Sequence, residues 1–333
     1  MKATYGIDIE SQDDRYVQIA EKGAEGFSAS VNAGSYLVDY IPILKYLPTW
    51  FPGAEFKRRG KVWKRAVDAM REVPFQFSKD HMARGDLKSC AAMSLLESFS
   101  APNKGNDYRE TVIKDTLGTI YAAGSETTVS TIASFFLAMV LFPHVQEKAQ
   151  REIDAVVGTD RLPTFSDRDN LPYIDAILKE CLRWHPVIPL NIPHSVTEDD
   201  IYDGYLLPKG SRVVVNSWAI LHDESVYEAP HLFNPDRFIK HGQLDPLAQD
   251  PTVAAFGFGR RKCPGMLLAK DSAWIMIACV LSAFKINPEK DDEGRDIIPE
   301  EDYCEGLLSH PAQFPCSIKP RSVRHGEIIS ETI

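Results

Sequence analysis

The segment from Phe256 to Gly265 has the residue types and spacing best suited to chemistry. It reads Phe-Gly-Phe-Gly-Arg-Arg-Lys-Cys-Pro-Gly, and its cysteine, Cys263, stands directly before an apolar stretch that predicts a helix. Unpaired N–H groups at a helix N-terminus and neighbouring basic side chains both favour a thiolate over a thiol. Gly257 and Gly259 allow the backbone to approach a flat or bulky group and to donate N–H groups to sulfur. The segment therefore predicts a reactive or ligating cysteine.

Other interpretations of this loop fit its spacing less well. A dinucleotide fingerprint beginning at Gly257 would need glycine at position 262, which is Lys262, and a Walker-type phosphate loop beginning at Gly259 would need glycine at Pro264. A hydrolase with a cysteine–histidine pair stays open, although no local protease signature accompanies Cys263. A structural turn with an inert cysteine is the remaining alternative.

A second candidate lies within a long predicted helix, 111–142, where the chain reads Ala-Gly-Ser-Glu-Thr-Thr from Ala123 to Thr128. A glycine inside a helix costs about 1 kcal/mol relative to alanine, so Gly124 needs a reason. Small residues would let a large planar ligand or dioxygen approach the backbone. A threonine hydroxyl can bond the carbonyl one turn back, and Glu126 with Thr127 could relay protons. The alternative is helix packing at Gly124 with an exposed Glu126.

A third candidate joins an acid and two arginines. Glu180 and Arg183 stand three residues apart on a predicted helix, and Arg237 follows in the aromatic, irregular segment from Phe233 to Phe238. Taken alone, the first two would form an ordinary surface pair worth about 0.2–0.5 kcal/mol. A buried Glu180 could instead accept charge-assisted, bidentate bonds from both arginines.

The elements that must position these residues are mostly helical. Prolines and glycines predict helices over about 57–79, 111–142, 143–158 and 172–184, and from after Cys263 to about 284, with an irregular loop over 40–56. A β-hairpin is predicted from 200–205 and 211–216 around Pro208-Lys209-Gly210. We expect an acidic surface loop over 289–302 and short strands near 305–318. The fold class is therefore mostly α with small β-sheets in the C-terminal half.

Composition excludes several function classes. The 333 residues are 44% hydrophobic and 25% charged, which excludes disordered and collagen-like chains. The net charge of −10 argues against nucleic acid as the main partner. Six scattered cysteines predict neither a disulfide framework nor a zinc site. The sequence has no signal peptide and no window of about 18 consecutive apolar residues. The nearest, 132–142 and 274–284, fit buried helices.

A basic run follows an aromatic segment in the first half of the chain. Lysines and arginines cluster between Lys57 and Arg65, just downstream of Trp50 and Phe51. One interpretation is a solvated helix face. The other is a membrane-surface patch, since aromatic side chains beside a basic cluster suit a lipid headgroup interface.

Taken together, these motifs resemble those of the cytochrome P450 family of haem-thiolate monooxygenases. The pattern Phe-x-x-Gly-x-Arg-x-Cys-x-Gly of that family matches at every fixed position, and the other motifs occur in the family's order. The resemblance covers essentially the whole chain, so we expect residues 1–333 to form a single, partial cytochrome P450 domain. The sequence is similar to fungal members of secondary-metabolite and xenobiotic type. The matched positions are Phe256, Gly259, Arg261, Cys263 and Gly265.

The resemblance implies a role for each site residue. Cys263 would ligate the iron of haem b, and Phe256, Gly259 and Gly265 would belong to the cofactor-binding loop. Arg261 and His194 would pair with haem propionates. Thr127 would steady dioxygen, and Glu126 would lie on the proton path. Glu180, Arg183 and Arg237 would brace the core. The segments 120–125, 187–191 and 306–309 would face substrate.

The resemblance also implies an activity and partners. We expect one oxygen atom from O2 to be inserted into a lipophilic organic substrate by hydroxylation or epoxidation, with electrons from NADPH-cytochrome P450 reductase. Arg260 and Lys262 would help to dock that reductase. Family members are expected at the endoplasmic reticulum membrane.

The beginning of the chain departs from the family pattern. Met1 falls within a middle helix of that pattern, so we expect the N-terminal anchor, the first sheet strands and the early helices to be missing. The alternative function is accordingly a truncated, catalytically impaired haem-binding remnant without turnover.

Overall fold

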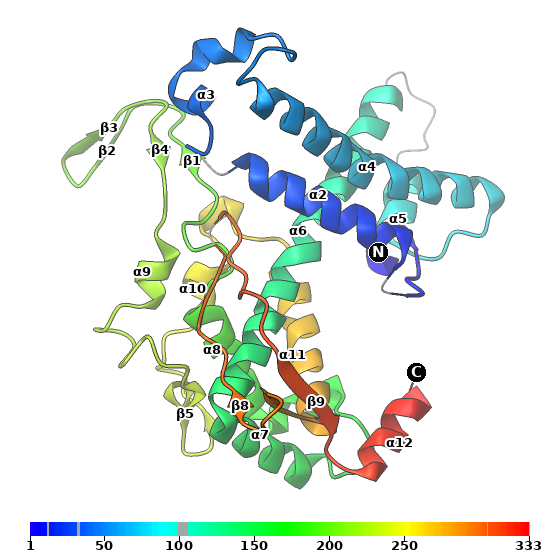
Figure 1. Cartoon of the computed structure of the whole chain (residues 1–333), viewed down its shortest axis with the longest axis vertical. Helices are drawn as coiled ribbons and strands as arrows, with labels where there is room; N and C mark the ends of the chain where they lie inside the picture. The colour runs from blue at the N-terminus through cyan, green and yellow to red at the C-terminus, as the bar shows by residue number, and fades with distance from the viewer. Residues whose placement is uncertain (12, 32–33, 99–105, 305, 333) are drawn as a thin grey trace. The chain divides into compact units, whose positions relative to one another are not determined.

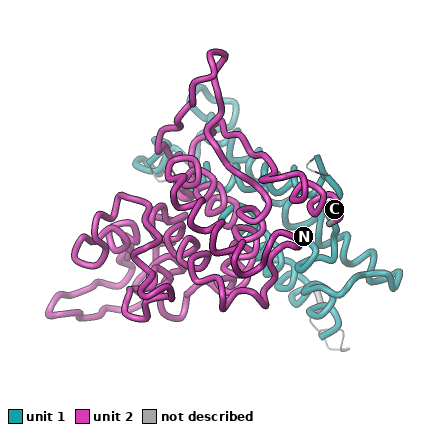
Figure 2. The backbone as a smooth tube through the Cα atoms, turned by 90° about the horizontal axis from the view of Figure 1, so that it is seen from below, with its two compact units in different colours: residues 1–127 teal, residues 128–333 magenta. Residues whose placement is uncertain are grey.

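The structure is a computed structural model that describes residues 1–11, 13–31, 34–98, 106–304 and 306–332 (Figure 1). Its internal contacts divide the chain into two compact units, Met1–Thr127 and Thr128–Ile333, which Figure 2 colours separately. Long helices dominate, and the strands of the described residues form two- and three-stranded antiparallel sheets. The prediction of a mostly α fold with small β-sheets is confirmed.

In its described residues the first unit consists of helices and connecting turns and contains no strand. Its core holds Tyr5, Met70, Phe75 and Leu117, all at most 3% exposed. Helices α2 and α4 lie close together because two glycines of α2 face α4: a Cβ on Gly23 would stand 3.1 Å from the Met70 side chain. The elements are α1 (Lys2–Tyr5), α2 (Arg15–Val31), α3 (Leu37–Tyr40), η1 (Pro42–Tyr46), α4 (Glu55–Arg84), α5 (Ala91–Ser98) and α6 (Asn106–Leu141), which continues into the second unit.

Two predictions for this unit need adjustment. The helix expected to end near Lys79 runs on to Arg84, where Gly85 adopts a left-handed φ of 77° and ends it. The segment 40–56, expected to be irregular throughout, contains the short 3-10 helix η1, and α4 already begins at Glu55. The short helix η1 forms because Pro42 stands at its first position, where the fixed φ of proline suits the start of a helix.

The second unit packs its helices around one large apolar core. That core includes Phe135, Ile177, Trp184, Trp274 and Leu281, each no more than 1% exposed. The stretches 132–142 and 274–284, expected to be buried helices, both contribute to it. The elements are α7 (Pro143–Val156), η2 (Phe165–Asn170), α8 (Pro172–Trp184), α9 (Ser217–Leu221), η3 (Pro235–Phe238), α10 (Thr252–Ala255), η4 (Gly259–Arg261), α11 (Met266–Ala283) and α12 (Val323–Thr332).

The strands of the second unit form hairpins and one three-stranded sheet. β1 pairs with β4, β2 with β3 and β5 with β6, all antiparallel, and β7 lies between β8 and β9. The strands are β1 (His194–Ser195), β2 (Asp200–Tyr202), β3 (Tyr205–Leu207), β4 (Arg212–Val213), β5 (Ile239–Lys240), β6 (Gln243–Leu244), β7 (Phe284–Lys290), β8 (Asp296–Ile297) and β9 (Cys316–Pro320).

The predicted hairpin around Pro208-Lys209-Gly210 is wrong. β2 turns back into β3 at Asp203 and Gly204, whose left-handed φ values of 51° and 80° suit a two-residue hairpin turn. The following strand, β4, pairs with β1 instead, with His194 opposite Val213. The acidic segment 289–302 is likewise only partly a loop, because β8 lies within it and pairs with the end of β7.

Among the residues that the structure describes, two helices have the length and hydropathy of a membrane span by composition alone. They are α6, over Tyr108–Leu141, and α11, with 50% and 39% of their most apolar windows buried. Core helices commonly share these properties, so length and hydropathy do not by themselves assign a span here.

Candidate active site

Glu180, Arg183 and Arg237 form a buried ion cluster. Both carboxylate oxygens of Glu180 accept from Arg183, Oε2 from Nε and Oε1 from an Nη, each at 2.8 Å. Arg237 Nε donates to Glu180 Oε1 at 3.2 Å, and the backbone N–H of Asn234 donates to the same oxygen at 2.7 Å. The side chains of Glu180 and Arg183 are 0% exposed. The surface-pair interpretation is therefore wrong, and the structure brings all three residues together.

The same arginines fasten neighbouring loops to α8. Arg183 donates to the carbonyls of Leu221 and Leu232, at 3.1 and 3.2 Å. Arg237 donates to the carbonyls of Glu228 and Leu232, at 2.7 and 3.2 Å. Because irregular backbone has few partners of its own, these charge-assisted bonds hold the segment 221–237 in place.

The cysteine loop connects α10 to α11. Its backbone doubles back at Gly257 and Gly259, whose φ values are 74° and 56°. The N–H of Cys263 donates to the carbonyl of Phe256 at 2.8 Å, which closes the loop, and α11 begins three residues later. The prediction that the cysteine directly precedes a helix is confirmed.

The donor set of this loop fits a haem. The Cys263 thiol is exposed and unoxidised. Within the described residues it has no hydrogen-bond partner, and neither do the side chains of Arg261 and His194, which are also exposed. Phe256 is half-buried against the core of the second unit. Leu267 and Leu268 beside the thiol are 69% and 65% exposed. An unpaired thiol, an unpaired guanidinium, an unpaired imidazole and exposed apolar side chains suit haem, a flat and largely apolar group that carries two carboxylates.

This geometry bears on the alternatives for Cys263. No histidine among the described residues makes a hydrogen bond with its thiol, whereas a cysteine hydrolase needs a base within hydrogen-bond reach. The described part of the chain also holds no cluster of three His, Cys, Asp or Glu side chains suited to a metal ion. The loop therefore offers one sulfur ligand, as a haem needs.

Thr127 and Glu126 lie half-buried on α6, at the end of the first unit. Thr127 Oγ1 donates to the carbonyl of Ala123 at 2.8 Å, as the sequence predicted. A Cβ added to Gly124 would meet no atom of its own unit within 4 Å, so close packing inside that unit does not explain the glycine.

Two of the segments expected to face substrate are joined by hydrogen bonds. The N–H of Ser309 donates to the carbonyl of Val187 at 2.8 Å. The carbonyl of Ser309 accepts from Ser130 Oγ of α6 at 2.5 Å. Val187 and Ser309 are 122 residues apart in sequence, so this bond holds the distant segments 187–191 and 306–309 side by side in the second unit. We call these two segments together the joined wall. The third segment, 120–125, lies in the first unit.

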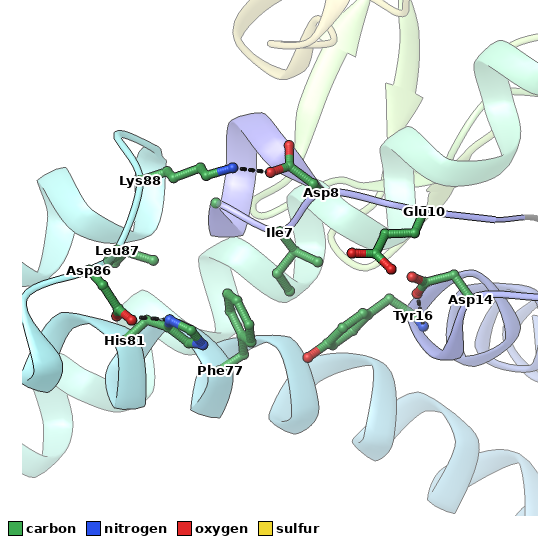
Figure 3. Close-up of a pocket in the computed structure, with 11 residues that line it drawn as sticks. Ile7, Asp8, Glu10, Asp14, Tyr16, Phe77, His81, Asp86, Leu87 and Lys88 are labelled. Carbon is green, nitrogen blue, oxygen red and sulfur yellow. Dashed lines mark hydrogen bonds and ion pairs between the residues drawn. The ribbon is translucent and has the colours of Figure 1, made fainter. Parts of the chain in front are cut away.

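A pocket of about 400 Å³ in the first unit holds none of the predicted site residues (Figure 3). Apart from Glu10, its charged side chains have partners in the described chain. Asp8 pairs with Lys88, His81 bonds Asp86 at 2.8 Å, and Asp14 accepts from the N–H of Tyr16 at 2.8 Å. These contacts stabilise the chain around α1 and α4 and identify no ligand.

A buried histidine beside the arginine cluster makes stability depend on pH. His222 is 9% exposed, stacks on Trp218 at 4.2 Å and donates from Nδ1 to the Trp218 carbonyl. Burial, with the charge of Arg183 nearby, lowers the pKa of His222 to about 4 from a usual value near 6.5. Between these values the unfolded chain binds more protons, so stability falls as the pH drops through this window.

We expect the free energy of unfolding to be about 2 kcal/mol lower at pH 5 than at pH 7.5 through His222 alone. Urea unfolding of the chain and of His222→Phe at both pH values measures that share, since phenylalanine keeps the stack on Trp218 but cannot ionise. The variant should show a smaller difference between the two pH values. An equal difference in both proteins would contradict the assignment.

Comparison with known proteins agrees with the site. The family model for cytochrome P450 matches residues 1–316, so the chain belongs to the cytochrome P450 family. It is 42% identical to a cytochrome P450 monooxygenase of Armillaria gallica, over 99% of this chain and 64% of that protein. It is 43% identical to cytochrome P450 monooxygenase 208 of Postia placenta, over 99% and 63%. It is 40% identical to tryptamine 4-monooxygenase of Psilocybe cyanescens, over 96% and 63%.

These relatives confirm the resemblance to fungal members of the family. The chain spans about 64% of the length of the first of these relatives.

Proposed function

We propose that this chain is a haem-thiolate monooxygenase that inserts one oxygen atom from O2 into a lipophilic organic substrate. The observation that carries the proposal is the exposed, unpaired Cys263 on a closed glycine loop directly before α11. Membership of the cytochrome P450 family and relatives named monooxygenases support it. The family match spans both compact units, which supports one domain over residues 1–333.

Each site residue has a role toward haem b. Cys263 Sγ would ligate the iron as a thiolate, with Phe256, Gly259 and Gly265 shaping the loop around it. Arg261 and His194 would hold the propionates. The guanidinium of Arg261 and the imidazole of His194 are both exposed and unpaired within the described chain, and both can donate hydrogen bonds to a carboxylate. Haem, when bound, supplies the oxygen activation and electron transfer that the protein groups lack. Thr127 would hold a proton on Oγ1, and Glu126 would supply protons to that hydroxyl.

The carbon-monoxide difference spectrum of the reduced, haem-supplemented chain tests this proposal. A thiolate-type Soret band is the expected result, since only a sulfur-ligated haem gives it. A chain that takes up no haem would support the alternative of a remnant without turnover, and a haem without the thiolate-type band would exclude Cys263 as the ligand.

The substrate class follows from the residues of the joined wall. Val187, Ile188, Leu190, Leu307 and Leu308 are apolar, so an apolar organic molecule is the substrate that this wall suits. We propose oxidation of secondary metabolites or xenobiotics. Incubation with a panel of lipophilic compounds and mass spectrometry of products 16 Da heavier, the mass of one oxygen atom, tests it.

Electron delivery is proposed to come from NADPH-cytochrome P450 reductase. Arg260 and Lys262 lie within the cysteine loop, and both are exposed and unpaired in the described chain, so they can meet an acidic partner surface. Lys262→Glu should slow haem reduction about tenfold at low salt and weaken its salt dependence. Stopped-flow reduction measures this, with Lys240→Glu, an exposed lysine on β5, as the control. Equal rates for both variants would contradict docking at the loop.

A membrane surface is the proposed location of the first unit, with the endoplasmic reticulum as the organelle. Exposed apolar and aromatic residues are frequent from α3 to the start of α4: Trp50 is 77% exposed, and the others are Leu37, Tyr40, Ile41, Ile43, Tyr46 and Phe51. Lys57 and Arg58 of α4 donate to the carbonyls of Leu47 and Thr49, at 2.6 and 2.8 Å. These bonds hold the aromatic segment beside the basic start of α4, an arrangement that suits anionic headgroups over apolar chains.

Replacing Trp50 and Phe51 together by serine should lower the affinity for vesicles containing anionic lipid about tenfold or more, because two aromatic side chains would no longer be buried in the lipid. Co-sedimentation with vesicles measures it. The double serine variant at Tyr202 and Tyr205, which are 74% and 73% exposed on the β2–β3 hairpin, is the matched control. Unchanged sedimentation of the first variant would leave the basic run as a solvated helix face.

A further inference from the structure

Asn191 occupies an unusual backbone position in the second unit. Its φ is 53°, one of four positive values among described residues other than glycine. Asparagine adopts this left-handed conformation more readily than most residues. The turn is closed by the Asn191 N–H, which donates to the carbonyl of Ile188 at 3.1 Å. The conformation directs the Asn191 side chain away from the segment 187–191 and toward α9.

The amide of Asn191 begins a hydrogen-bond chain that reaches α10. Asn191 Nδ2 donates to the Oγ of Ser217, which is the first residue of α9. Ser217 Oγ in turn donates to the carbonyl of Ala254 at 3.1 Å. Ser217 and Ala254 are both 0% exposed, so water does not compete for these bonds.

The chain ends on the cysteine loop. The carbonyl of Ala254 also accepts the N–H of Gly257 at 3.4 Å. That N–H belongs to the same peptide unit as the carbonyl of Phe256, which accepts the N–H of Cys263 at 2.8 Å. The amide oxygen of Asn191 lies 3.9 Å from the place where a Cβ on Gly257 would stand. The amide nitrogen of Asn191 is therefore linked through Ser217 to the carbonyl of Ala254, and its amide oxygen lies near Gly257 of the cysteine loop.

The backbone makes this connection rigid. The N–H of Trp218 donates to the carbonyl of Pro189 at 3.0 Å, and Asn216 Oδ1 caps α9 by accepting from Ala219 at 2.9 Å. The first bond joins the segment 187–191 to α9 next to the Asn191–Ser217 bond, and the second fixes the start of α9 itself.

We propose that Asn191 and Ser217 are positioning residues that set the conformation of the cysteine loop and hence the place of the Cys263 sulfur. The link also couples the wall formed by 187–191 to that loop. The inference rests on the proposed function only in that the sulfur so placed is the haem ligand. The hydrogen-bond chain itself can be tested without haem.

Hydrogen exchange measured by mass spectrometry on the full chain tests the series of hydrogen bonds from Asn191 through Ser217 to Ala254. In Asn191→Gly, which keeps the left-handed backbone, and in Ser217→Ala, peptides covering 256–263 should exchange on the order of fivefold faster, the effect of one lost hydrogen bond. Asp203→Gly is the matched control, because it changes a residue of nearly equal φ, 51°, in the β2–β3 turn. Exchange in the loop unchanged from the control would overturn the proposal. If Ser217→Ala fails to fold, Asn191→Gly alone decides.

The spectrum of the haem-loaded chain supplies a second readout. Both variants should convert part of the thiolate-type band of the reduced carbon-monoxide complex into the band of a haem without thiolate, while Asp203→Gly should not. Faster exchange with an unchanged band would overturn the step from the loop to the sulfur. Absence of haem binding in the unsubstituted chain would refute the proposed function and leave the exchange result to judge the hydrogen-bond chain.

Discussion

Glu180→Gln is expected to lower the free energy of unfolding by about 3–5 kcal/mol. The substitution keeps the shape of the side chain but removes its charge. Arg183, at 0% exposure, then keeps a positive charge in the core without a counterion, and Arg237 loses the same partner. The N–H of Asn234 loses a charged acceptor as well. Urea unfolding followed by circular dichroism measures the change.

The matched control is Glu327→Gln on α12. Glu327 pairs with Arg324, also three residues apart, but the two side chains are 56% and 44% exposed. Water screens that pair, so its loss should change stability by less than about 1 kcal/mol. A change of similar size in both variants would show that the burial of the Glu180 cluster does not determine its contribution. Where Glu180→Gln is too unstable to purify, Arg237→Gln, which removes the outer partner, should show a smaller loss in the same direction.

Cys263→Ser is expected to abolish the thiolate-type Soret band of the reduced carbon-monoxide complex. A serine hydroxyl stays protonated near neutral pH and gives the iron far less electron density than a thiolate. The fold should remain, because Cys263 is exposed and its hydrogen bonds in the described chain, to Phe256 and Met266, are made by its backbone and not by its thiol. The difference spectrum and far-ultraviolet circular dichroism together separate loss of the ligand from loss of the fold.

Cys304→Ser is the control for this variant. Cys304 is also exposed and free, and it lies 41 residues downstream in the segment before β9. This variant should keep the full band. A band that survives in Cys263→Ser would assign the ligand to another cysteine, and with it the cysteine loop would lose its role.

Local chemistry made much of the helical framework predictable. The helix α8 begins at Pro172 and ends at Trp184, as expected, because proline is suited to the first helical position and Pro186 prevents continuation. α7 likewise begins at Pro143 and ends just before Gly158, which adopts a φ of 80°. The cysteine loop was identified in the same way, since its glycines, basic residues and cysteine are neighbours in sequence.

Pairing between strands could not be read from sequence to the same extent. A turn signal at Pro208-Lys209-Gly210 is present, but a second, tighter turn at Asp203-Gly204 lies a few residues earlier. The sequence contains both, and the partner of each strand depends on which edges meet in the folded chain. β4 met β1 rather than β2.

By itself, then, the sequence determined the order of the helices, the cysteine loop and the family. Those properties depend on residues close together in the chain. Only the tertiary structure decided that Glu180 is buried with two arginines rather than exposed beside one. It alone turned Asn191 toward Ser217, and Ser217 toward Ala254, over 63 residues of sequence. Burial and hydrogen bonds between distant segments depend on which surfaces pack together, and no local pattern contains that information.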